Sequence, residues 1–364
     1  MKTLLANRVL LGQAKRLVIK VGSSSLTKDG ALNEPALSSL VDVVGAAHAR
    51  GQEVVLVSSG AVAAGLAPLG FASRPKMLRD QQAASMVGQV RLLAAYTREF
   101  GRYGITIAQV LLTPEDVLNR THYANAQGSL RRLLHHGVVP IVNENDAVVT
   151  GELRFGDNDR LAALTAHLVD ATALILCTDV DGLYTAPPSE PGARLICEVT
   201  SMEQVKGFTI TGKGSDVGTG GMQTKVEAAK IAISGGVGAL VTSADNLSQA
   251  LDGHEVGTWF VPQARRQSAR HLWLKNVAQA RGSIVVDDGA AEVVRAGGAS
   301  LLCVGVTQVR GTFSRGALVR VLDSHGTEVA RGLAGYSSAD IRRFLDDGGR
   351  APRPIVHADD LVRC

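Results

Sequence analysis

The sequence has few of the features that mark membrane, secreted or metal-stapled proteins. Its 364 residues include only four cysteines, which form no CxxC pair. No run of 18 uninterrupted apolar residues is present, and residues 1–16 mix basic and amide side chains with short apolar pieces. We therefore expect a reduced, cytoplasmic protein with no disulfide framework, zinc site, membrane span or secretory signal.

Aromatic residues and an excess of one charge are also scarce. Aromatics make up 4% of the chain, and 38 basic against 34 acidic side chains give a formal net charge of +4. This balance indicates neither a nucleic-acid nor a membrane partner by charge alone. The 40 glycines follow no strict period, which excludes collagen, and with 45% apolar residues they favour an α/β enzyme with tight strand-to-helix turns. The length allows two or three domains.

Short β-branched runs alternate with helical patterns through about residue 261. The strands predicted from these runs are residues 16–21, 53–57, 105–111, 138–142, 171–177 and 238–242, and helices are expected at 34–50, 75–101, 121–136 and 225–234. Runs that are apolar on both faces and separated by helices indicate a buried, mostly parallel sheet in a doubly wound domain. Short alternating runs with glycine-rich turns then predict a small, mainly antiparallel β domain over 282–364, joined by a linker at 262–281.

Two strand ends carry candidate anion-binding residues, because ligands of open α/β sheets bind at the carboxyl ends of the strands. Lys20 lies inside the first strand, where a buried lysine needs an anionic partner; the alternative is a strand-end lysine that reaches solvent. Residues 58–60 (SSG) follow the second strand and offer N–H groups and hydroxyls to a carboxylate or phosphate. A simple helix cap is equally compatible with them.

Two further polar segments follow later strands. Residues 143–146 (NEND) and 156–159 (GDND) could fix an ammonium group, orient lysines or hold Mg²⁺, although a solvated loop has the same composition. Residues 178–179 (TD) end another strand, and 218–225 (GTGGMQTK) would present N–H donors and a lysine to phosphates. The latter matches neither the P-loop nor the GxGxxG pattern. Two lysines, a glycine-rich turn and a carboxylate cluster suit phosphoryl transfer, and no nucleophile–base pair is evident.

In their order, these segments resemble the bacterial glutamate 5-kinases, members of the amino-acid kinase superfamily. The segments that carry the resemblance are 18–23 (VIKVGS), 57–61 (VSSGA), 141–148 (IVNENDAV), 156–159, 178–179, 182–185 (GLYT) and 218–225, and 282–289 (GSIVVDDG), 311–316 (GTFSRG) and 336–338 (YSS) are similar to a PUA domain. The resemblance implies a three-layer α/β sandwich with a mostly parallel central sheet over residues 16–261 and a PUA-like domain over 282–364, with residues 1–15 outside it. It also implies ATP-dependent phosphorylation of the γ-carboxylate of L-glutamate, the first step of L-proline biosynthesis.

The resemblance implies roles for particular residues. Lys20 would lie against the transferring phosphoryl group, Lys225 would stabilise the leaving group, and Asp159, with Asp157 as a less certain companion, would pair with both lysines. Substrate-binding positions are Ser59, Asn143, Asp146 and Asn158, where Asp146 would attract the ammonium group and Ser59 and Asn158 would donate to carboxylates. ATP-binding positions are Lys20, Thr178, Asp179, Thr219, Gly220, Gly221, Met222, Gln223, Thr224 and Lys225. The nucleotide would carry Mg²⁺, with no metal ligands assigned to the protein.

Expected partners follow from the same resemblance. They are L-glutamate and ATP, proline as a feedback inhibitor, a second copy of the chain in a homo-oligomer, and glutamate-5-semialdehyde dehydrogenase. PUA domains commonly contact RNA, but residues 282–364 hold ten arginines and ten acidic residues, so RNA is not expected. The competing interpretations are a kinase for aspartate, acetylglutamate, carbamate or a nucleoside monophosphate, an RNA-binding protein, and a structural protein that keeps the kinase fold.

Overall fold

The computed structural model describes residues 7–28, 31–149, 158–205, 221–262 and 280–363. The chain divides into two compact units, Met1–Arg270 and His271–Cys364. The predicted linker at 262–281 falls almost wholly outside the described residues, so its boundaries remain a prediction.

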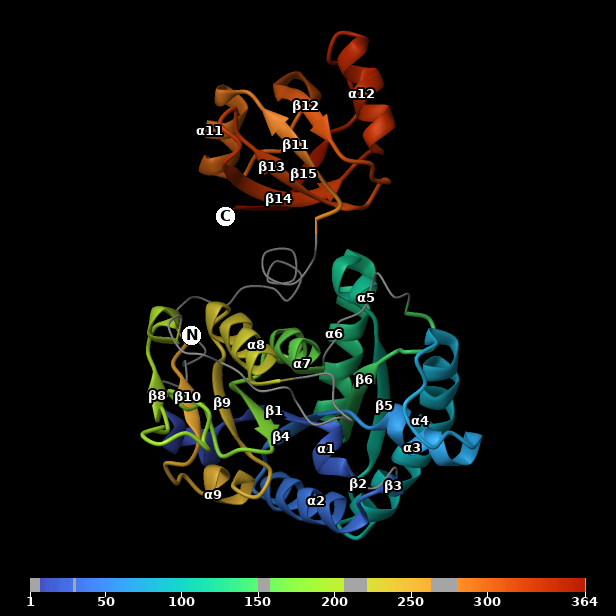
Figure 1. Cartoon of the computed structure of the whole chain (residues 1–364), viewed down its shortest axis with the longest axis vertical. Coiled ribbons are helices and arrows are strands. Elements are labelled where there is room, and N and C mark those ends of the chain that lie inside the picture. Colours follow the sequence, from blue (N-terminus) through green and yellow to red (C-terminus); the bar gives the residue numbers. More distant parts are fainter. Residues whose placement is uncertain (1–6, 29–30, 150–157, 206–220, 263–279, 364) are drawn as a thin grey trace. The chain divides into compact units, whose positions relative to one another are not determined.

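The first unit is built on a mostly parallel sheet of eight strands within the described residues, in the order β5-β6-β4-β1-β7-β9-β10-β8 (Figure 1). The strands are β1 (Arg16–Val21), β4 (Glu53–Ser58), β5 (Ile107–Leu112), β6 (Val139–Glu144), β7 (Ala173–Thr178), β8 (Glu198–Val199), β9 (Gly238–Ser243) and β10 (Thr258–Phe260). β10 runs antiparallel to β9, and the other neighbours are parallel. All six predicted strands are confirmed, whereas β8 and β10 are too short for their pattern to be read.

Helices cover both faces of this sheet and make three layers. Their bounds are α1 (Ser23–Leu26), α2 (Glu34–Ala49), α3 (Ala61–Leu66), α4 (Leu78–Gly101), α5 (Pro114–Leu118), α6 (Arg120–His135), α7 (Asn158–Leu168), α8 (Met222–Ser234) and α9 (Leu247–Leu251), with 3₁₀ turns η1 (Arg8–Gln13), η2 (Ala67–Leu69) and η3 (Met202–Val205) and a hairpin of β2 (Thr27–Lys28) and β3 (Ala31–Leu32). Figure 1 shows α6, α7 and α8 on one face and α2 and α9 on the other. Side chains of α2, α4 and α9 share one core with alternate residues of β1, β4 and β7. The predicted sandwich is confirmed.

Helices α3 and α4 cross with their backbones in contact. A Cβ added at Gly65 would lie 1.8 Å from the carbonyl oxygen of Ala84, and one added at Gly88 would lie 1.7 Å from that of Ala61. No side chain fits at either position, so glycine is required on both helices. This crossing fixes α4 against the turn that follows β4.

The second unit has its own sheet and core. Its elements are β11 (Gly282–Val286), α11 (Asp288–Ala296), η4 (Cys303–Gly305), β12 (Val306–Arg310), β13 (Leu318–Leu322), β14 (Glu328–Ala334), α12 (Ser338–Asp346) and β15 (Val356–Arg363). The strand order is β12-β11-β13-β14-β15, antiparallel except for the β11–β13 pair. The mainly antiparallel character is therefore as predicted. Within the described part of the chain, no helix is long and apolar enough to cross a bilayer.

Candidate active site

The alternation of side chains along β1 decides where Lys20 points. Ile19 and Val21 lie in the core shared with α2 and α4. Because successive side chains of a strand point to opposite faces, Lys20 is directed toward the face covered by α7 and α8. Its side chain is 4% exposed, and its Nζ lies 2.6 Å from Oδ1 of Asp159, in the first turn of α7. The anionic partner that burial of this lysine requires is therefore present.

Asp159 joins two lysines from different elements. Nζ of Lys225, in the first turn of α8, lies 3.3 Å from its Oδ2, and the Thr224 hydroxyl donates to the same oxygen at 2.9 Å. Burial raises the pKa of the Asp159 carboxyl group, but Lys20, Lys225 and the hydrogen bond from Thr224 together hold it below its ordinary value. The carboxylate is thus ionised at neutral pH, and the three charged groups leave one net positive charge in a buried place.

A second cluster of amides and hydroxyls lies beside these charges. Nδ2 of Asn158 lies 2.9 Å from Oγ of Ser59, 3.2 Å from the carbonyl oxygen of Ser58 and 2.9 Å from Oδ1 of Asn143, and its two hydrogens are shared among these three acceptors. Three of the four predicted substrate residues, Ser59, Asn143 and Asn158, are therefore brought together from the turn after β4, from β6 and from α7. Asn158 was expected to donate to substrate carboxylates, but its donor group is occupied by protein oxygens. Its buried Oδ1 is the group without a partner among the described residues.

The turn after β4 is shaped by Gly60, which has φ +101° and precedes α3. This left-handed conformation favours glycine and lets the chain leave the strand sharply. The Ser59 N–H donates to the carbonyl of Val21 at 3.2 Å, so this N–H is used within the protein. The Ser59 hydroxyl remains the polar group directed toward Asn158.

The predicted nucleotide residues lie at other strand ends. Thr178 ends β7, and its hydroxyl donates to Asp179 at 2.9 Å. Gly221 precedes α8, and its carbonyl oxygen lies 2.8 Å from the Thr224 hydroxyl, whose single proton it shares with Asp159. The next residues, Met222 and Gln223, begin α8. Thr219 and Gly220 lie outside the described residues, as does Asp157.

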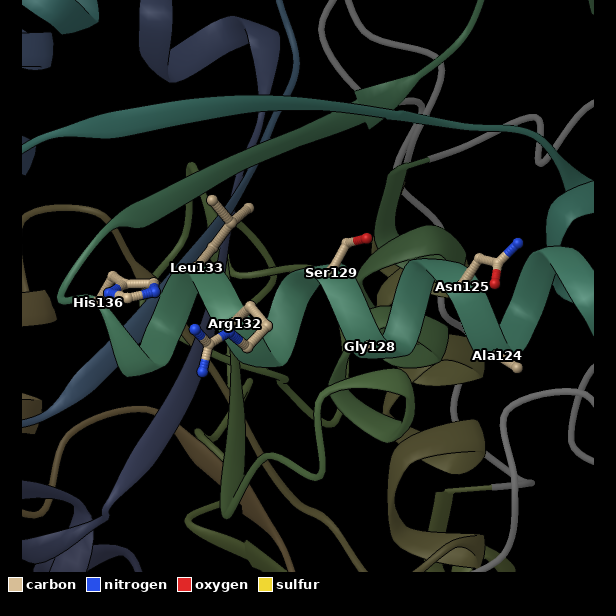
Figure 2. Close-up of a pocket in the computed structure, with 7 residues that line it drawn as sticks. All are labelled: Ala124, Asn125, Gly128, Ser129, Arg132, Leu133 and His136. Carbon is tan, nitrogen blue, oxygen red and sulfur yellow. The ribbon is translucent and has the colours of Figure 1, made fainter.

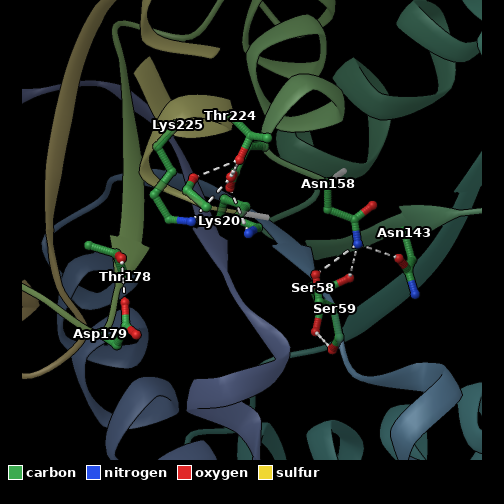
Figure 3. Close-up of polar contacts among 11 residues, drawn as sticks. Lys20, Ser58, Ser59, Asn143, Asn158, Thr178, Asp179, Thr224 and Lys225 are labelled. Atoms are coloured by element: carbon green, nitrogen blue, oxygen red, sulfur yellow. Dashed lines mark hydrogen bonds and ion pairs between the residues drawn. The ribbon is translucent and has the colours of Figure 1, made fainter. Parts of the chain in front are cut away.

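Strand order separates the two groups of residues. β1 has β4 and β6 on one side and β7 and β9 on the other. Ser59 and Asn143 come from the first side, whereas Thr178 and Lys225 belong to the second (Figure 3). Lys20 lies on β1, at the boundary between these two groups of strands. From β1 the chain continues to β4 on one side, whereas from β7 it continues to β8 and β9 on the other side, so the connections run in opposite directions from this boundary. Such a switch point is where open α/β sheets bind ligands.

Comparisons with known proteins show the family of this chain. Residues 15–243 match the model of the amino acid kinase family, and residues 282–356 match that of the PUA domain. Glutamate 5-kinase from Bifidobacterium animalis subsp. lactis (strain AD011) is 50% identical, over 98% of this chain and 97% of its own. Glutamate 5-kinase from Thermobifida fusca (strain YX) is 51% identical, over 98% of this chain and 95% of its own. The chain belongs to the glutamate 5-kinase branch of the amino acid kinase family.

A solved structure supports the fold of this family member independently. Carbamate kinase from Giardia lamblia bound to AMP-PNP aligns with a TM-score of 0.51 at 18% identity, covering 69% of this chain and 100% of its own. At that identity the likeness concerns the fold alone. The fold class and the resemblance stated above are both confirmed.

Sequence reasoning missed a row of polar residues on α4 of this kinase. The Ser85 hydroxyl donates to Oδ2 of Asp146 at 2.8 Å, Gln82 donates to the carbonyl of Val149 at 3.1 Å, and Gln89 accepts from Nδ2 of Asn143 at 3.0 Å. These contacts hold the segment after β6 that carries the predicted substrate residues. The signal was in the sequence, because polar residues at spacings of three and four on a core-facing helix must find partners.

Two other features lie near or outside the site. Burial raises the pKa of the Cys177 thiol to about 12, an effect that Lys20 and Lys225 only partly offset, so this cysteine on β7 stays a thiol. A shallow pocket on α6 is lined by side chains such as Asn125, Ser129 and Arg132 (Figure 2). Its lining contains none of the predicted site residues.

Proposed function

We propose that this protein transfers the γ-phosphoryl group of ATP to the γ-carboxylate of L-glutamate, giving γ-glutamyl phosphate for proline biosynthesis. The observation that carries the proposal is the buried Lys20–Asp159–Lys225 cluster between the two ligand regions. A second support is that two relatives matching the chain over almost its whole length are glutamate 5-kinases.

The cluster suits an acceptor that is already an anion. A glutamate side chain has a pKa of about 4.3, so at neutral pH it attacks without a general base. The barrier lies instead in repulsion between the carboxylate and the nucleotide phosphates. Lys20 at the border would meet the transferring group, and Lys225 would neutralise charge on the leaving phosphates. Asp159 holds both ammonium groups in place and is too enclosed to act as a base itself.

Mg²⁺ would enter with the nucleotide and would neutralise phosphate charge. Within the described residues, no group of three or more His, Cys, Asp or Glu side chains is placed to hold a metal ion. Thr178 and Asp179 would contact the nucleotide at the end of β7, beside the glycine-rich turn before α8. In this proposal, the protein itself neutralises phosphate charge through Lys20 and Lys225.

The amide cluster supplies the acceptor site in this proposal. Asp146 would attract the ammonium group of glutamate, and the Ser59 hydroxyl would donate to a carboxylate. Asn158 orients Ser59 through Nδ2 and leaves Oδ1 to accept from the substrate. Asn143 connects Asn158 to α4.

Further properties are proposed from family membership. They comprise inhibition by proline at or near the glutamate site, assembly as a homo-oligomer, a location in the cytoplasm, and association with glutamate-5-semialdehyde dehydrogenase, which would protect a labile acyl phosphate. RNA binding is not proposed, because residues 282–364 carry ten arginines and ten acidic side chains.

An acceptor panel tests the proposed function. Purified protein, ATP and Mg²⁺ are incubated with glutamate, aspartate, acetylglutamate, carbamate or a nucleoside monophosphate, and acyl phosphate is trapped as hydroxamate while ADP is measured. Of these acceptors, we expect only L-glutamate to give strong turnover. Strong turnover with another acceptor and none with glutamate would refute the proposal.

A further inference from the structure

Gln89 makes one of the two contacts between α4 and the predicted substrate residues. Ser85 and Gln89 are one turn apart on α4, and they contact Asp146 and Asn143 respectively. Side chains four residues apart lie on the same helix face. Gln89 therefore faces the same segment as the substrate residues, although no function has been assigned to it above.

Two backbone groups fix the orientation of the amides around Gln89. The N–H of Glu144 donates to Oδ1 of Asn143 at 2.9 Å, so the oxygen of that amide must lie there. Its Nδ2 then faces Gln89, which accepts through Oε1 at 3.0 Å. The carbonyl of Ser58 fixes Asn158 in the same way. Nε2 of Gln89 is consequently directed away from Asn143.

This Nε2 is a buried donor without a partner among the described residues. Gln89 is only 7% exposed, so bulk water does not reach the group freely. Leaving a buried donor unsatisfied is unfavourable, and a protein recovers that free energy when a ligand supplies the acceptor. A carboxylate next to Asn143 and Asp146 would be such an acceptor.

We propose that Gln89 is a substrate-binding residue whose Nε2 donates to the α-carboxylate of the amino-acid substrate. This inference rests on the proposed function. Asn158 is adjacent to Asp159, so the chain of amides from Asn158 through Asn143 to Gln89 leads away from the lysines. The γ-carboxylate must lie beside Lys20 to react. Gln89 therefore meets the other end of glutamate, where the α-carboxylate is.

Two substitutions separate the donor from the rest of the side chain. Gln89→Glu keeps the shape and the oxygen that accepts from Asn143 but removes the donor. Gln89→Met conserves volume and removes both groups. Gln82→Met is the matched control, because Gln82 supports the same segment from the same helix but its Nε2 already donates to Val149.

Kinetics of the three variants test the inference, each checked for folding by its thermal transition. We expect Gln89→Glu and Gln89→Met to raise the KM for glutamate by at least about tenfold, the value of one hydrogen bond to a charged group. The KM for ATP should change less than about twofold, and Gln82→Met should have a smaller effect on glutamate than either. If Gln89→Glu does not fold, Gln89→Met still decides.

A shortened ligand shows which end of the substrate is involved. 4-Aminobutyrate lacks the α-carboxylate, and its inhibition constant against glutamate should be the same in wild type and Gln89→Met. Three results would overturn the assignment. They are an equal loss of affinity for glutamate and 4-aminobutyrate in Gln89→Met, an unchanged KM for glutamate in Gln89→Met, and a rise in that KM in Gln82→Met as large as in Gln89→Met. If wild type fails to phosphorylate glutamate at all, the proposed function fails instead, and the inference falls with it.

Discussion

Replacing Asp159 by asparagine should expose the electrostatic cost of the buried lysine pair. The Asp159 side chain is fully buried, with ammonium groups 2.6 and 3.3 Å from its oxygens, and both lysine side chains are less than 10% exposed. Asp159→Asn keeps the volume but removes the carboxylate that both buried ammonium groups contact. Removing one partner of a buried ion pair costs about 3–5 kcal/mol, and we expect the free energy of unfolding without nucleotide to fall by that amount.

Urea unfolding measures this loss, with Glu227→Gln as the control. Glu227 pairs with Arg160 in a partly exposed position, where an ion pair contributes about 1 kcal/mol or less. A saturating ATP analogue should recover part of the loss in Asp159→Asn, since its phosphates replace the missing anion. A loss no larger than that of the control, or no greater stabilisation by nucleotide than in wild type, would refute the electrostatic account.

The same substitution has a predictable pH dependence. The pKa of Asp159 is lowered in the folded state, so its stabilising effect is complete above the unfolded value of about 3.9 and is lost as the pH falls through the folded value. The gap between wild type and Asp159→Asn should therefore be constant from about pH 5 upward and close only below about pH 4. A gap that closes between pH 5 and 7 would show that another group is responsible.

Three further predictions concern separate parts of the site. Lys225→Ala should lower kcat by a factor on the order of 10² with folding intact, and near-normal turnover would contradict charge neutralisation. Asp146→Ala should raise the KM for glutamate by more than about tenfold. Ser85→Ala should raise the same KM by roughly threefold, because it loses only the hydrogen bond that orients Asp146. An unchanged KM in Asp146→Ala would remove that residue from the substrate site. Gly88→Ala should lower the free energy of unfolding in urea by about 3 kcal/mol, because its methyl group would meet the Ala61 carbonyl, and a loss below about 1 kcal/mol would show that α3 and α4 can separate.

Local pattern was sufficient for much of the fold. Residues 16–21 are predicted as a strand and form β1 with the same bounds, because an uninterrupted β-branched run has few alternatives. The strand predicted at 105–111 begins two residues later, at Ile107, since a pattern locates ends less well than centres. Strand order depends on pairing between distant segments, so it could not be derived from periodicity.

In the site, too, features set by one segment could be predicted, whereas contacts between segments far apart in the chain could not. A lysine inside a strand implied a buried anion, and Asp159 provides it. The free group of Asn158, in contrast, depends on which oxygens two other segments, residues 58–59 and Asn143, bring to its amide. Gln89 was visible as a polar residue at helical spacing on α4, but its partner Asn143 is 54 residues away in the chain.

The arrangement around β1 also has a consequence for how such a kinase can change. The residues proposed to bind the acceptor come from the ends of β4 and β6, supported by α4, whereas those proposed to bind the nucleotide come from the end of β7 and from α8. Substitutions that admit a new acceptor can therefore accumulate on one half of the sheet while the phosphoryl donor keeps its contacts. The two halves meet in the first turn of α7, where Asn158 faces the amides and Asp159 faces the lysines. A one-residue shift of that helix start would move Asn158 away from the amides and Asp159 away from the lysines, so the register of α7 is the feature that evolution of a new specificity has to preserve.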